Sequence, residues 1–155
     1  MGTADIVRQL QGLSIGISAF ESLRADRKVY VDKTAFVAEL AAWPVQKILL
    51  ARPERFGKTL LSSTFRSLFA NNLRDFDGLS IAKTWKDRTY PVVGMDLSGL
   101  PQFRDEASFR SALIAHLLSA FGSVGFTYDA TSRISFFDQF RIWLAELPLN
   151  SLVLI

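Results

Sequence analysis

The stretch KILLARPERFGKTLLSSTF, residues 47–65, decides the fold of this chain. It joins an apolar run to a helical pattern through Gly57-Lys58-Thr59, which ends the phosphate-binding pattern G-x-x-x-x-G-K-[ST]. A match to the whole pattern requires a glycine at position 52, where this chain has Arg52. The triplet therefore indicates a working phosphate loop, a decayed one or a chance match, and its surroundings decide among them.

The residues on either side of the triplet favour a phosphate site. QKILLA, residues 46–51, is a nearly continuous apolar run typical of a strand buried on both faces of a parallel sheet. Apolar residues then recur at helical spacing from Thr59 until Asn71-Asn72. A turn from a buried strand into a helix presents the unpaired N–H groups of the first helical turn to an anion. The alternative is a helix start that reads Gly-Lys-Thr by chance.

The chemistry of the triplet suits a nucleotide. Gly57 has no side chain, so the backbone can come close to a phosphate. Lys58 is placed to reach the β and γ phosphates, and Thr59 to present its hydroxyl to Mg²⁺. The sequence therefore predicts a magnesium nucleotide as ligand, and it leaves the preference for ATP or GTP open.

Strand and helix patterns alternate along the rest of the chain. In order, the sequence predicts a helix from about Thr34 to Pro44, a strand at 91–97, a helix at about 105–121, a helix from about Ser135 to Pro148 and a strand at 152–155. Such alternation means βαβ units, a parallel sheet and right-handed crossovers. The predicted fold class is α/β, and we expect residues 1–155 to form a single domain because no linker or repeat interrupts them.

Composition and charge narrow the range of functions. The 155 residues are 49% hydrophobic and include no cysteine, which excludes a disulfide framework and a cysteine-bound metal. Every apolar run is shorter than the roughly 18 residues that span a bilayer, so we expect a soluble, cytoplasmic protein without a membrane partner. The net charge is +3, and residues 47–59 carry four basic side chains against one acidic. Because the whole excess falls on the suspected loop, a small polyanion explains it as well as a nucleic acid would.

Four segments in order give the chain a family resemblance. FESLR at 20–24, YVDKT at 30–34, ARPERFGKTLL at 51–61 and YPVVGMDLSG at 90–99 resemble the predicted AAA-ATPase-like family of bacteria and archaea. In that family the loop typically reads R-P-R-R-F-G-K-[ST], which makes Arg52-Pro53 a family feature. Glu54 stands where the family usually has a basic residue, and we expect it to pair with Arg52 or Arg55.

The resemblance implies a P-loop NTPase-like domain with a three-layer parallel sheet and flanking helices, binding ATP and Mg²⁺. The implied nucleotide-binding residues are Arg52, Pro53, Glu54, Arg55, Phe56, Gly57, Lys58, Thr59 and Leu60, with Lys58 as the catalytic cation and Thr59 as the metal ligand. Asp32-Lys33-Thr34 falls where related ATPases carry a segment that packs by the nucleotide base, so Asp32 is a further candidate. The alternative for Asp32 is a helix cap. Within the domain, 1–44 is expected to be an N-terminal segment and 45–155 the first part of the core.

The resemblance also implies that the chain is truncated after its third core strand. The family's Walker B strand is an apolar run followed by Asp-Glu, and SLVLI at 151–155 resembles that run. ATP hydrolysis is then expected to need residues beyond Ile155. In the implied strand order 5-1-4-3-2, a fourth strand fills the gap between the first and the third, and we expect that strand outside these 155 residues.

Two other functions stay open at this point. Members of the family are frequently followed by a restriction-endonuclease-like domain, so the ATPase could regulate a nuclease that acts on nucleic acid in defence or mobile elements. A non-hydrolysing interaction domain is the second alternative. Oligomerisation is possible, since neighbouring subunits of related ATPases often supply an arginine.

Overall fold

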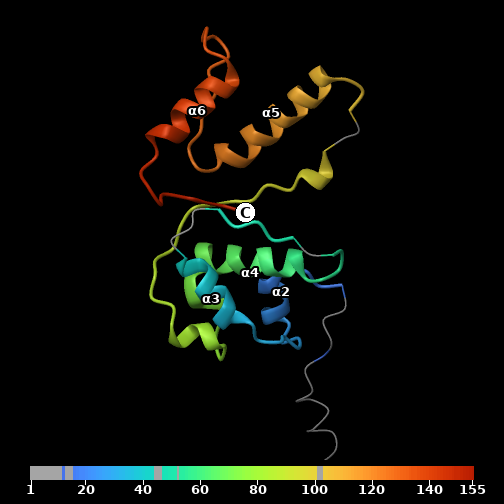
Figure 1. Ribbon diagram of the computed structural model, residues 1–155, viewed down its shortest axis with the longest axis vertical. Coiled ribbons are helices and arrows are strands. Elements are labelled where there is room, and N and C mark those ends of the chain that lie inside the picture. Colours follow the sequence, from blue (N-terminus) through green and yellow to red (C-terminus); the bar gives the residue numbers. More distant parts are fainter. Residues whose placement is uncertain (1–11, 13–15, 44–46, 52, 101–102) are drawn as a thin grey trace, which may run out of the picture. The chain divides into compact units, whose positions relative to one another are not determined.

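The structure is a computed structural model that describes residues 12, 16–43, 47–51, 53–100 and 103–155 (Figure 1). These residues form two compact units, which divide between Thr89 and Tyr90. We expected one domain, with an N-terminal segment at 1–44 and the first part of the core at 45–155, and this division stays a prediction.

The first unit is helical. It contains the α-helices α2 (Phe20–Ala25), α3 (Thr34–Ala42) and α4 (Lys58–Asn71), followed by the 3₁₀ helices η1 (Asn72–Asp75) and η2 (Ser80–Lys83). The helices α2 and α3 lie beside α4 in Figure 1, and α4 contacts both of them. The longest helix of the unit therefore begins directly at the predicted phosphate loop and forms the unit's centre.

The fold of α4 follows from its sequence. One face buries Thr64, Ser67 and Leu68, and the hydroxyl of Thr64 donates to the Leu60 carbonyl oxygen at 2.8 Å, so a buried polar group is satisfied within the helix. The helix ends at Asn71, and its C-cap Asn72 has a φ of 55°, which lies in the left-handed region. This confirms the predicted helix and its end at Asn71-Asn72.

The core of the first unit gathers buried residues from α2, α3, α4 and η2 and from the segments on either side of η2. Its buried members are Phe20, Val37, Leu68, Phe76, Leu79, Ile81 and Trp85. Phe20 and Phe76 have ring centroids 4.7 Å apart. Burying each large side chain contributes on the order of 2 kcal/mol, so this cluster supplies most of the packing that holds α4 and the loop before it.

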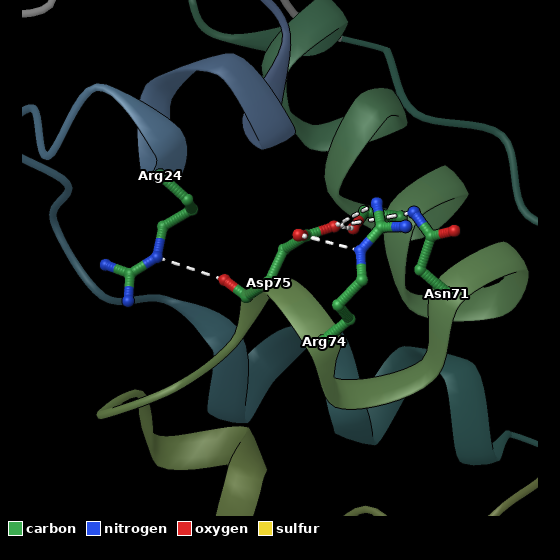
Figure 2. A network of polar contacts seen from close by, with 5 residues as sticks. Arg24, Asn71, Arg74 and Asp75 are labelled. Carbon is green, nitrogen blue, oxygen red and sulfur yellow. Dashed lines mark hydrogen bonds and ion pairs between the residues drawn. The ribbon is translucent and has the colours of Figure 1, made fainter.

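A network of polar contacts links the C-terminal end of α4 to η1 (Figure 2). The carboxylate of Asp75 accepts from the buried hydroxyl of Ser67 at 2.7 Å and pairs with Arg74 at 3.2 Å. Its backbone carbonyl accepts from Arg24 Nε at 3.0 Å, which ties α2 to η1. Partial burial raises the pKa of Asp75, but hydrogen bonds from Arg74 and Ser67 outweigh it and hold the pKa below its usual range.

The second unit combines two helices with a small sheet. It contains β1 (Val92–Val93), the 3₁₀ helix η3 (Leu97–Gly99), α5 (Glu106–Gly122), α6 (Phe136–Glu146) and β2 (Val153–Leu154). The strands pair in parallel, with Val92 opposite Val153 and Val93 opposite Leu154. Hydrogen bonds from Ile155 N to Val93 O and from Met95 N to Ile155 O, both 2.8 Å, extend the ladder. The strands predicted at 91–97 and 152–155 are therefore parallel neighbours, as the implied strand order requires, but they are shorter than predicted, and Leu97 begins η3.

Capping and aromatic packing build the two helices of this unit. Asp105 and Ser108 form a capping box at the start of α5, and Ser135 caps α6 by accepting from Asp138 N. Between the helices lies a cluster of edge-to-face rings, in which Phe121 and Phe140 have centroids 4.8 Å apart. The predicted helices at 105–121 and from Ser135 are confirmed to within a residue.

The predicted first strand is wrong in the part of the chain that the structure describes. Residues 47–51 form no strand, and Ile48 and Leu49 are 49% and 93% exposed instead of buried; Gln46 lies outside the described residues. A strand exists only with a hydrogen-bonded neighbour, and among the described residues only β1 and β2 pair. The fold class α/β is confirmed with mostly helices and a two-stranded parallel sheet, whereas the three-layer P-loop sheet stays a prediction.

Candidate nucleotide site

The loop between residue 53 and α4 turns twice through the left-handed region. Arg55 has φ 61° and Gly57, the N-cap of α4, has φ 72°. A Cβ at Gly57 would meet no atom within 4 Å, so the backbone angle requires glycine there and the space above it is open. Arg55 adopts the same region without glycine's freedom, at a cost of roughly 1 kcal/mol, and such strain is typical of ligand-binding loops.

Lys58 lies back over this loop. Its ammonium Nζ donates to the carbonyl oxygen of Pro53 at 3.0 Å, across the turn that Glu54 and Arg55 form. The cation is thus held at the mouth of the loop, where an anion bound to the first-turn N–H groups of α4 would meet it. The first helical hydrogen bond, from Leu61 N to Gly57 O at 2.9 Å, fixes the direction of those groups.

The other predicted loop residues differ in how exposed they are. Pro53, Glu54, Phe56 and Thr59 are exposed, and Leu60 is half-buried against the core of the first unit. Glu54 forms no ion pair with Arg55 in the described part of the chain, and Arg52, its other expected partner, lies outside the described residues. The structure therefore brings Gly57, Lys58 and Thr59 together at one helix start.

Asp32 has a different setting. Its Oδ1 accepts from the backbone N and the hydroxyl of Thr34 at 2.9 and 2.6 Å, at the start of α3. Its Oδ2 accepts from the N and the hydroxyl of Ser80 at 2.8 and 2.7 Å, at the start of η2. A carboxylate has about four accepting positions, and these four bonds fill them. Asp32 thus joins the starts of two helices, whose N-cap residues are Lys33 and Leu79, and these bonds give it a structural role as a link between them.

The electrostatics of Asp32 follow from these bonds. Partial burial raises the pKa of the carboxyl, but hydrogen bonds from Thr34 and Ser80 outweigh it and hold the pKa well below its usual range. The Thr34 hydroxyl also accepts from the buried N–H of Ile81 at 3.1 Å, so the link continues into the core.

A pocket of about 310 Å³ opens beside the loop, within the first unit. Phe56 and Gly57 line one side, Tyr30 and Lys33 lie on the segment before α3, and Phe36 lies on α3 itself. Sequence reasoning did not connect these aromatic residues with the loop. The only signal was their position in the YVDKT segment and the helix after it, 20 to 30 residues before Gly57.

The residues present fit a magnesium ion that a nucleotide brings with it. The hydroxyl of Thr59 lies in the first turn of α4 and is exposed. No group of three or more metal-binding side chains gathers among the residues that the structure describes. Mg²⁺ commonly takes one or two protein oxygens and completes its shell with phosphates and water, and the hydroxyl of Thr59 can supply such an oxygen.

A comparison with protein families decides the family of the chain. The family model described as Predicted AAA-ATPase matches residues 14–151, which include the loop, α4 and nearly all of the second unit. The chain belongs to the predicted AAA-ATPase family. The match confirms the resemblance of the four sequence segments, and it carries no information on an attached nuclease domain.

One curated relative of this predicted AAA-ATPase is the "Uncharacterized protein in vnfD 5'region" of Azotobacter chroococcum mcd 1. The two sequences are 39% identical over 89 residues, which is 56% of this chain and 17% of the relative. The chain thus matches about a sixth of the relative's length. No solved structure matches the chain.

None of the helices in the described part of this AAA-ATPase family member is long and apolar enough to cross a bilayer.

Proposed function

We propose that this chain binds Mg-ATP through the loop Arg52–Thr59. The observation that supports the proposal is the position of Lys58. This residue directly follows Gly57, whose backbone is left-handed, and its ammonium lies 3.0 Å from the Pro53 carbonyl oxygen. That position places a cation at the start of a 14-residue helix, beside the N–H groups of its first turn. Membership of the predicted AAA-ATPase family makes a nucleoside triphosphate the polyanion that suits it.

In this proposal the residues have separate tasks. The N–H groups at the start of α4 cradle the phosphates, and Lys58 exchanges its bond to Pro53 for the β and γ phosphates. Thr59 contributes one oxygen to Mg²⁺, which when bound neutralises charge on the phosphates. We place hydrolysis with an acidic pair that follows Ile155, because β2 resembles the family's Walker B strand and the ladder continues to Ile155. The activity of the whole protein is part of the same proposal.

Calorimetric titration with Mg-ATP tests the binding step. Hydrogen bonds to charged groups contribute roughly 1.5 to 3 kcal/mol, so Lys58→Ala should weaken ATP binding at least tenfold. Lys86→Ala, which removes an exposed lysine of the same unit, is the matched control and should bind like the wild type. Equal affinity of the wild type and Lys58→Ala would refute the proposal.

A further inference from the structure

Glu54 is the one acidic side chain in residues 47–59, a stretch that carries four basic side chains. With Arg55 it forms the turn of the phosphate loop. We propose that Glu54 shifts the preference of the loop from metal-free triphosphates toward their Mg²⁺-bound form. The inference rests on the proposed function, because it requires the phosphates to lie at the Lys58 ammonium.

The hydrogen bond across the turn determines where Glu54 lies. The Lys58 ammonium donates to the carbonyl oxygen of Pro53 at 3.0 Å, and this carbonyl belongs to the peptide bond between Pro53 and Glu54. Standard bond lengths then keep the Glu54 carboxylate within roughly 10 Å of the ammonium in every rotamer. Phosphates that bind the ammonium are therefore within reach of the carboxylate charge.

The Glu54 carboxylate forms no ion pair with a cation in the described part of the chain. Both ion pairs that join described residues lie elsewhere, at Asp75 and at Asp138. The side chain of Glu54 is exposed, so its charge acts on a bound ligand through water. The loop thus presents a negative charge beside the cation that we expect to hold the phosphates.

The effect of one fixed charge grows with the charge of the ligand. Two unit charges roughly 10 Å apart in water change a binding equilibrium about twofold. A metal-free triphosphate carries about two more negative charges than its Mg²⁺-bound form, because the ion neutralises part of the charge. Glu54 should therefore weaken the binding of metal-free ATP about fourfold more than that of Mg-ATP.

The basic side chains of the loop act in the opposite direction. Cations such as Arg55 and Lys58 attract most strongly the ligand with the most negative charge, which is the metal-free form. Phosphoryl transfer depends on the metal, so a metal-free triphosphate would occupy the loop without reacting. A carboxylate beside the ammonium reduces this competition and leaves the ammonium in place.

The test is a pair of calorimetric titrations, one of ATP with Mg²⁺ and one of ATP with EDTA. They are run at about 0.01 M salt, where the Debye length is about 30 Å. Glu54→Gln removes the charge and keeps the shape of the side chain. Relative to the wild type, it should raise the ratio of metal-free ATP affinity to Mg-ATP affinity about fourfold. Glu54→Asp keeps the charge and should bind both forms like the wild type.

Asp77→Asn is the matched control. It removes an exposed negative charge from the turn after η1, and η1 begins at the C-terminal end of α4. A helix of 14 residues is about 21 Å long, so this substitution should change the affinity ratio less than twofold.

Two further measurements identify the effect as one of charge. Inorganic tripolyphosphate has the charge of the nucleotide without its base, and Glu54→Gln should shift its metal preference in the same direction. The shift should disappear at about 1 M salt, where the Debye length is about 3 Å. A shift that persists there would overturn the inference, because charge through water would not explain it.

The outcomes separate this inference from the proposed function. If Lys58→Ala weakens ATP binding but Glu54→Gln leaves the affinity ratio unchanged, phosphate binding stands and Glu54 has no part in the selection. Weaker binding of Mg-ATP by Glu54→Gln also overturns the inference, because the carboxylate then assists the metal. Absence of binding by the wild type refutes both. A thermal melt of Glu54→Gln checks that the exposed substitution leaves the fold intact.

Discussion

The Asp32→Ala substitution tests whether this residue is a structural link or a nucleotide contact. The carboxylate joins the starts of α3 and η2 through four hydrogen bonds of 2.6 to 2.9 Å. Loss of the hydrogen bonds that Asp32 accepts costs roughly 1 kcal/mol at each of the two helix starts. Because Asp32 and Ser80 are exposed, water replaces part of what is lost. We expect destabilisation by about 2 kcal/mol, or about 4 to 8 °C in Tm for a chain of this size.

Thermal and urea unfolding followed by circular dichroism measure this change. Glu39→Ala is the matched control, since it removes an exposed acid from the interior of α3 and should shift Tm by less than about 2 °C. Asp32→Asn should be intermediate, because an amide keeps one accepting oxygen. The structural role is refuted if Asp32→Ala melts like the wild type, and a loss of ATP affinity without destabilisation would identify Asp32 as a nucleotide contact.

Two further predictions concern charge in the first unit. Hydrogen bonds hold the pKa of Asp32 below its ordinary value of 3.8, so on acidification the unfolded chain takes up the proton before the folded chain does. The stability that Asp32 provides is therefore lost as the pH falls below about 4. The difference in unfolding free energy between the wild type and Asp32→Ala should shrink from pH 6 to pH 3, and a constant difference would contradict this. Asp75→Ala leaves the buried Ser67 hydroxyl without its acceptor and should cost about 1 to 3 kcal/mol by urea unfolding. Arg74→Ala breaks only an exposed ion pair and should cost less than about 1 kcal/mol, whereas equal losses would assign the stabilisation to the ion pair.

The sequence could predict the features that local chemistry determines. The start of α5 follows from Asp105 and the start of α6 from Ser135, since a capping side chain and its N–H partner lie within three residues of each other. Gly57 is another such feature, because its φ of 72° is needed at a turn into a helix. Each of these signals lies in a few consecutive residues, so no tertiary contact was needed to find it.

The features that the sequence missed depend on distant partners. The six-residue helix α2 is too short to show a periodic pattern, and it is held by Arg24, which reaches Asp75 from 51 residues away. Asp32 was ambiguous because Ser80, which fills half of its carboxylate, is 48 residues away. The apolar run at 47–51 predicted a buried strand, and this prediction is wrong among the described residues, because burial in a sheet needs a neighbouring strand that no local pattern reveals.

The phosphate loop and the apolar run at 47–51 therefore depend on different parts of the chain. Residues 47–51 have no strand partner among the described residues, yet Gly57 is left-handed and the Lys58 ammonium reaches Pro53 O. Those two features depend on α4, which the buried core of the first unit holds through Leu68 and the residues around it. We therefore expect the core that holds α4 to position Lys58. Titration of this chain with tripolyphosphate measures phosphate binding by the loop itself, and Lys58→Ala shows how much of that binding the ammonium supplies.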